Sequence, residues 1–163
     1  MVVPSPWRRV VQQEGALVSD VRIVSVLGAG ALGAAMASRL GETSHEVRLW
    51  NRTAERARAA AGQTRGGTPV DAATDAVAGA SVVITVLRDG DAVGEVMADA
   101  IAGVDEAAVW VQASTVGPRS ARALADLARD YGVAYLDAPV SGSTTPAREG
   151  KLVWLVAGED AAA

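Results

Sequence analysis

The polarity pattern of the chain alternates, from Val21 onward, between short apolar runs and longer amphipathic stretches. The apolar runs are rich in Val, Ile and Leu and show little internal alternation, which is typical of strands covered on both faces. We expect strands within residues 21–28, 45–51, 81–89, 108–115, 133–140 and 151–158.

The stretches between these runs carry helix signals. Thr53 and Asp71 stand where N-caps are expected, and Pro118 and Gly132 bound the last amphipathic stretch. We expect helices over residues 31–42, 53–62, 71–80, 91–104 and 118–132.

Strands that alternate with helices predict βαβ units, and therefore an α/β, doubly wound, mainly parallel sheet of the Rossmann type. Ligands of such sheets bind beyond the carboxyl ends of the strands. We expect that edge to be formed by the loops after Leu27, Trp50, Val86, Ala113 and Pro139.

Composition narrows the function classes. The 163 residues suit one domain, the net charge is -4, and acidic and basic residues are interspersed, so we expect no nucleic-acid partner. No apolar run has the length of a membrane span, and no membrane partner is expected. There is no cysteine, and His45 is the single histidine, so no metal site is expected.

Residues 1–20 contain two arginines but no apolar segment after them, so they resemble neither a signal peptide nor an anchor. We interpret them as a flexible N-terminal extension and residues 21–163 as the folded domain. A cytoplasmic location is consistent with the absence of cysteine.

A glycine loop follows the first expected strand. Gly28, Gly30 and Gly33 have the G-x-G-x-x-G spacing and open a helix, the context in which the motif binds a dinucleotide pyrophosphate. The alternative is a glycine-rich turn without a ligand. The loop residues assigned to the cofactor are Gly28, Ala29, Gly30, Ala31, Leu32 and Gly33.

The end of the second strand bears on the choice of cofactor. NAD sites usually place a carboxylate there, whereas this chain has Asn51, Arg52 and Thr53. Arg52 could pair with a 2′-phosphate, and the hypothesis is therefore NADP, with NAD possible. The alternative is that Arg52 is a solvated surface side chain and Thr53 only a helix cap.

Five segments together resemble the β-hydroxyacid dehydrogenase family over about residues 21–160: GAGALG, WNRT, VVITVLRDGDAV, STVGP and DAPVSGSTTPAREGKL. The resemblance is to the nucleotide domain, which is similar to the N-terminal domain of 6-phosphogluconate dehydrogenase. Ser143 and Pro146 stand where most of the family has glycine, a form associated with the glyoxylate/succinic semialdehyde reductase branch. Imine reductases are a related alternative, with other segments in place of STVGP and DAPVSG.

The resemblance implies further roles by position. Leu87 and Arg88 would line the cofactor, and Thr115 would lie near the nicotinamide. The loop of Ser141, Gly142 and Ser143 would hold a substrate carboxylate, for which a turn without a ligand is the alternative.

The resemblance also implies that the family's catalytic residue has no counterpart in this sequence. The family's catalytic lysine lies on a helix of a C-terminal helical domain, which we expect to be absent here. Lys151 does not occupy that position, so no catalytic residue is assigned. The chain is then a domain of a longer enzyme, a stand-alone NADP-binding module with sensory or regulatory function, or a decayed protein. A small carboxylate substrate, if a helical domain completes the site, and a homodimer are expected partners.

Overall fold

The computed structural model describes residues 23–43 and 46–157, whose centre is a six-stranded parallel sheet. The strands lie in the order β3-β2-β1-β4-β5-β6, and each neighbouring pair is parallel. Their bounds are β1 (Ile23–Leu27), β2 (Glu46–Trp50), β3 (Gly67–Pro69), β4 (Val82–Thr85), β5 (Val109–Gln112) and β6 (Ala134–Asp137). The direction of winding reverses between β1 and β4, which confirms the doubly wound prediction.

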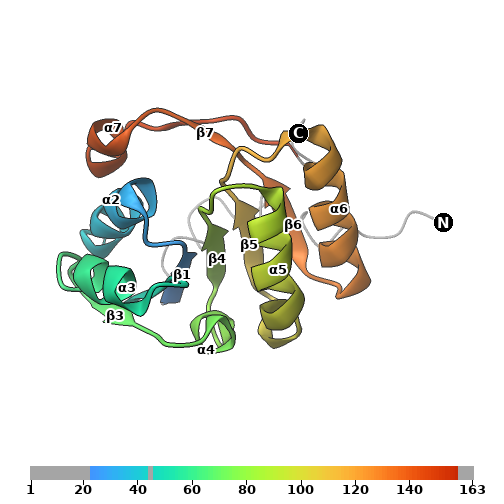
Figure 1. Cartoon of the computed structure of the whole chain (residues 1–163), viewed down its shortest axis with the longest axis horizontal. Helices are drawn as coiled ribbons and strands as arrows, with labels where there is room; N and C mark the ends of the chain where they lie inside the picture. The colour runs from blue at the N-terminus through green and yellow to red at the C-terminus, as the bar shows by residue number, and fades with distance from the viewer. Residues whose placement is uncertain (1–22, 44–45, 158–163) are drawn as a thin grey trace.

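Helices cover the sheet on both faces (Figure 1). Two of them, α2 (Ala31–Gly41) and α3 (Ala54–Ala61), pack on one face, and α4 (Ala73–Val77), α5 (Gly90–Ala100) and α6 (Gly117–Asp130) pack on the other. A 3-10 turn, η1 (Ile101–Gly103), extends α5. Three clusters of buried apolar side chains fill the interfaces between helices and sheet.

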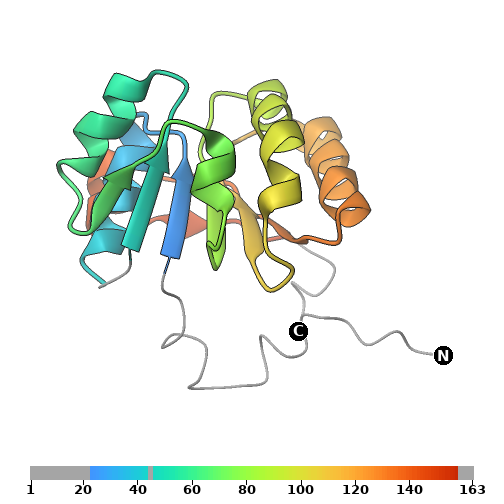
Figure 2. The same cartoon turned by 90° about the horizontal axis from the view of Figure 1, so that it is seen from below.

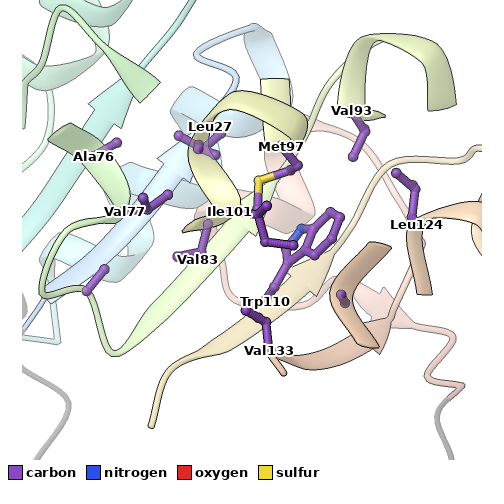
Figure 3. Close-up of a cluster of buried hydrophobic side chains, with 13 residues drawn as sticks. Leu27, Ala76, Val77, Val83, Val93, Met97, Ile101, Trp110, Leu124 and Val133 are labelled. Atoms are coloured by element: carbon purple, nitrogen blue, oxygen red, sulfur yellow. The ribbon is translucent and has the colours of Figure 1, made fainter. Parts of the chain in front are cut away.

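The largest cluster surrounds Trp110 of β5, which is fully buried. Met97 and Ile101 lie beside its indole ring (Figure 3). Trp110 Nε1 donates to Thr85 Oγ1 at 3.0 Å, so the one polar atom of the ring is satisfied inside the core. This contact ties β5 to β4 beneath the strand ends.

The chain after β6 does not continue the expected strand over residues 133–140. β6 ends at Asp137, and a separate antiparallel pair forms from β7 (Val140–Ser141) and β8 (Val153–Trp154). Pro139 has no N–H group with which to extend a ladder, which explains the interruption. The prediction of one continuous strand is therefore wrong, as is a full strand over 151–158 within the described part of that range.

Between β7 and β8 lies a helix that the polarity pattern did not predict, α7 (Thr144–Arg148). The segment runs back across the sheet, and α7 lies beside α2 (Figures 1 and 2). Ala147 is buried against Ala35 and Met36 of α2. The segment therefore covers the part of the sheet that α2 leaves open.

The structure corrects one smaller prediction and adds one strand. Asp71 does not cap α4, because the N-cap is Ala72, and the Asp71 carboxylate instead lies 3.3 Å from Arg58. The short strand β3 was not predicted, since its sequence of Gly, Thr and Pro has no apolar run. The expected extension at residues 1–20 and the side chain of His45 lie outside the described residues.

Candidate functional site

The glycine loop connects β1 to α2 at the carboxyl edge of the sheet. Gly28 has a φ of 117°, and a Cβ atom there would lie 2.1 Å from the carbonyl oxygen of Val86. Its N–H donates to the Trp50 carbonyl at 2.8 Å. A Cβ atom on Gly33 would lie 1.9 Å from the Gly28 carbonyl oxygen. Both glycines are thus required by close approach of the protein's own backbone.

Gly30 is different, because a Cβ atom there would meet nothing within 4 Å. It is the N-cap of α2 and has extended backbone angles, φ -72° and ψ -176°. The first helical hydrogen bond runs from Ala34 N to Gly30 O at 2.9 Å, so the N–H groups of residues 31–33 precede the helical ladder. No acidic side chain occupies this first turn. The open space therefore borders a helix end suited to an anion.

Asn51 locks the end of β2 against the glycine loop. Its Oδ1 accepts from Ala29 N at 3.1 Å, and its Nδ2 donates to the Thr53 carbonyl at 3.1 Å. Ala29 is itself buried, and its N–H is used by Asn51, so it is not a lining residue. Thr53 is the N-cap of α3 by position, but its side chain makes no capping hydrogen bond.

An open groove of about 510 Å³ runs from the glycine loop past the end of β2 to the first turns of α5. The residues that line it are Gly28, Gly30, Ala31, Leu32, Gly33, Trp50, Asn51, Arg52, Thr53, Arg56, Val86, Leu87, Arg88, Ala92, Glu95 and Val96. It therefore brings together every residue predicted for the cofactor except Ala29 and Thr115.

The groove is rich in cationic side chains. Arg52, Arg56 and Arg88 are exposed along it, and Glu95 is the one acidic side chain among its lining residues. Arg52 makes no hydrogen bond or ion pair with another residue in the described part of the chain, although its charge contributes to lowering the pKa of Asp89. Sequence reasoning missed Arg56, although its place three residues after the Thr53 cap puts it in the first turn of α3.

Arg88 is held by its neighbour. Its Nε donates to Asp89 Oδ2 at 2.6 Å, and the same carboxylate caps α5 by accepting from Ala92 N at 2.9 Å. The bond from Ala92 and the adjacent guanidinium lower the pKa of Asp89. Asp89 is thus fully engaged in positioning the β4–α5 loop.

The loops after β4 and β5 are joined by Ser114. Leu87 N donates to Ser114 Oγ at 2.8 Å, and the Gln112 side chain both accepts from Ser114 N and donates to Ser114 O. Thr115, the next residue, is exposed and does not line the groove. These bonds make a rigid edge on which the groove is built.

The loop predicted to hold a substrate lies apart from the groove. Ser141, Gly142 and Ser143 are exposed and are absent from the groove lining. Gly142 has a φ of 138°, and a Cβ atom there would lie 2.8 Å from Leu152 Cδ2. Lys151 pairs with Glu149 at 2.9 Å, on the surface and outside the groove.

Two negative findings apply to residues 23–43 and 46–157. They contain no group of three or more His, Cys, Asp or Glu side chains placed to hold a metal ion. None of their helices combines the length and the apolar character that crossing a membrane requires.

Comparisons with known proteins agree with this geometry. The family described as the NAD binding domain of 6-phosphogluconate dehydrogenase matches residues 23–163. A probable 3-hydroxyisobutyrate dehydrogenase of Mycobacterium tuberculosis is 34% identical over 137 residues, covering 84% of this chain and 46% of that protein. The chloroplastic glyoxylate/succinic semialdehyde reductase 2 of Arabidopsis thaliana is 30% identical, covering 83% of this chain and 38% of the reductase.

A solved structure of the Mycobacterium tuberculosis 3-hydroxyisobutyrate dehydrogenase with L-serine superposes with a TM-score of 0.81 at 33% identity. The match covers 86% of this chain and 47% of that one. The chain thus spans less than half the length of these relatives.

Proposed function

We propose that the groove of this chain, which belongs to the β-hydroxyacid dehydrogenase family, binds NADP(H) in preference to NAD(H). The family membership rests on its NAD-binding domain of the 6-phosphogluconate dehydrogenase type. The domain is that of 3-hydroxyisobutyrate dehydrogenase-like oxidoreductases. The proposal concerns which cofactor occupies the groove and which residues hold it.

The observation that carries the preference is the chemistry at the end of β2. Arg52 and Arg56 face the groove there, and no carboxylate does. A carboxylate at this point would bond the ribose hydroxyls of NAD and repel a 2′-phosphate. Two guanidinium groups favour the phosphate, because Arg forms paired, charge-assisted hydrogen bonds to phosphate oxygens.

The rest of the groove supports the same ligand. The open space over Gly30 and the N–H groups of residues 31–33 suit the pyrophosphate. Leu87 and Arg88 line the groove at the carboxyl end of β4. Thr115 is on the same edge of the sheet, at the end of β5, where we propose the nicotinamide binds. The nicotinamide, when bound, supplies or accepts a hydride.

A small carboxylate substrate is proposed for the loop of Ser141, Gly142 and Ser143, within a site completed by further structure. These residues are exposed and carry hydroxyl and backbone donors. On this proposal, only the completed site turns over a hydroxyacid or semialdehyde. A cofactor-binding module without catalysis is the second candidate, because the described residues that line the groove include neither lysine nor histidine.

The test is calorimetric titration of the chain with NADPH and NADH. We expect NADPH to bind more tightly, and Arg52→Asp to abolish or reverse the preference by about tenfold to a hundredfold, as for hydrogen bonds to charged groups. Arg65→Asp, an exposed arginine outside the groove, is the matched control and should leave the ratio unchanged. Equal affinities for the two cofactors in the parent chain would rule out the preference.

A further inference from the structure

We propose that Glu95 recognises the adenine of the cofactor, with its carboxylate accepting a hydrogen bond from the exocyclic 6-amino group. The inference rests on the proposed function, because it requires a dinucleotide in the groove. It assigns a role to a residue that neither the motifs nor the resemblance singled out.

The groove has three distinct walls. One is the glycine loop, suited to the pyrophosphate, and the second is the end of β2, where Arg52 and Arg56 lie. The third comes from the β4–α5 loop and the first turns of α5. Its lining residues are Val86, Leu87, Arg88, Ala92, Glu95 and Val96. With the phosphates assigned to the first two walls, the base is left for the third.

The third wall has the chemistry of a base-binding surface. Ala92, Glu95 and Val96 are spaced three and four residues apart on α5, so they lie on one face of the helix. Leu87, Ala92 and Val96 offer apolar surface, which suits the flat face of a purine. Beside that surface Arg88 can only donate, and Glu95 adds the one carboxylate that could accept from the edge of the ring.

Hydrogen-bond complementarity selects Glu95 within this wall. The adenine edge presents one donor, the 6-amino group, and the three arginines of the groove can only donate. Asn51 Oδ1 already accepts from Ala29, and Asp89 already accepts from Ala92 and Arg88. Glu95 makes no hydrogen bond or salt bridge with any other described residue. It attracts the Arg88 guanidinium electrostatically, but its oxygens remain free to accept a hydrogen bond.

Charge supports the same reading. A carboxylate in a groove for an anionic dinucleotide repels the phosphates, and the repulsion falls with distance. The Glu95 carboxylate is therefore compatible with a dinucleotide if it accepts a hydrogen bond from a group that lies far from the phosphates. The amino group of the base meets that condition.

The experiment compares NADPH with its 6-deamino analogue, in which hydrogen replaces the 6-amino group of the base, by calorimetric titration of the whole chain. We expect the parent chain to bind NADPH about tenfold more tightly, since the analogue offers no donor at position 6 to Glu95. Glu95→Ala should bring the ratio of the two dissociation constants to near one. Glu95→Gln should retain part of the preference, because the carboxamide oxygen can still accept from the 6-amino group.

Asp91→Asn is the matched control, since Asp91 lies on the same helix and lines the groove between α5 and α6, which Glu95 also borders, but does not line the cofactor groove. It should retain the parent's ratio. A parent chain that does not distinguish the two bases, or a Glu95→Ala variant that still does, would overturn the assignment. So would a Glu95→Gln variant that changes only the ratio of NADPH to NADH, which would mean that the residue contacts the ribose. A parent chain that binds neither nucleotide would instead refute the proposed function itself.

Discussion

The two valine substitutions Gly30→Val and Gly33→Val are expected to act on different properties of the domain, although the glycines are three residues apart. A Cβ atom on Gly33 would lie 1.9 Å from the Gly28 carbonyl oxygen and 3.6 Å from Val26 Cγ1. The first distance is far inside van der Waals contact, and both partners belong to the strand–loop junction. The start of α2 must therefore move away from β1 to accept any side chain.

The magnitude follows from that clash. Overpacking costs about 1–3 kcal/mol, and a clash with backbone is at or above the upper end of this range. Replacing a helical glycine by valine returns only about 0.4 kcal/mol of helix propensity. The net loss for Gly33→Val is then about 3 kcal/mol, which lowers the melting temperature by roughly 6–12 °C for a domain of this size.

Gly30→Val has open space around its Cβ atom and extended backbone angles that valine adopts readily. The expected cost is the loss of a favourable N-cap residue, up to about 1 kcal/mol or roughly 2–4 °C. The side chain would occupy the space proposed for the pyrophosphate, so NADPH binding should be lost.

The assay combines thermal unfolding followed by circular dichroism with calorimetric titration of NADPH at a temperature where both variants are folded. Melting temperatures that are equal for the two variants would refute the reasoning from close approach. Unchanged NADPH affinity in Gly30→Val would refute the placement of the pyrophosphate.

Further predictions concern the core, the surface and activity. Tyr135→Phe should stabilise the domain by about 1 kcal/mol at neutral pH in urea unfolding, because the buried Tyr135 hydroxyl has no hydrogen-bond partner among residues 23–43 and 46–157. Burial raises the pKa of Tyr135 above that of an unfolded tyrosine, so the parent should lose stability as the pH rises above 10, and the Phe variant should lose less. The four residues 153–156 are exposed and apolar, so sedimentation should detect self-association that Leu155→Lys reduces. The 163-residue chain alone, mixed with NADPH and glyoxylate or succinic semialdehyde, should turn over far below about one per second, since Lys151 is paired with Glu149 outside the groove; faster absorbance loss would contradict this.

Local chemistry in the sequence was enough to predict the parallel sheet, the reversal of winding and the glycine loop. The apolar runs of β1 and β4 show little alternation, which is typical of parallel strands that helices cover on both faces. The roles of Gly28 and Gly33 followed from spacing, and the structure places backbone oxygens where their Cβ atoms would be. Segments without an apolar run, such as β3 and α7, gave no such signal.

Other features depended on which residues the folded chain brings together. Arg56 and Glu95 enter the groove because α3 and α5, from opposite faces of the sheet, both begin at its carboxyl edge. The Asn51 side chain accepts a hydrogen bond from Ala29 N and donates one to the Thr53 carbonyl, and no sequence spacing predicts these two bonds. Residues 138–140 were predicted to continue the strand of β6, yet the chain turns back there, and Ala147 of α7 becomes buried beside α2. Periodicity records which faces of an element are apolar, whereas the partner of each face is decided only when distant elements compete to cover it.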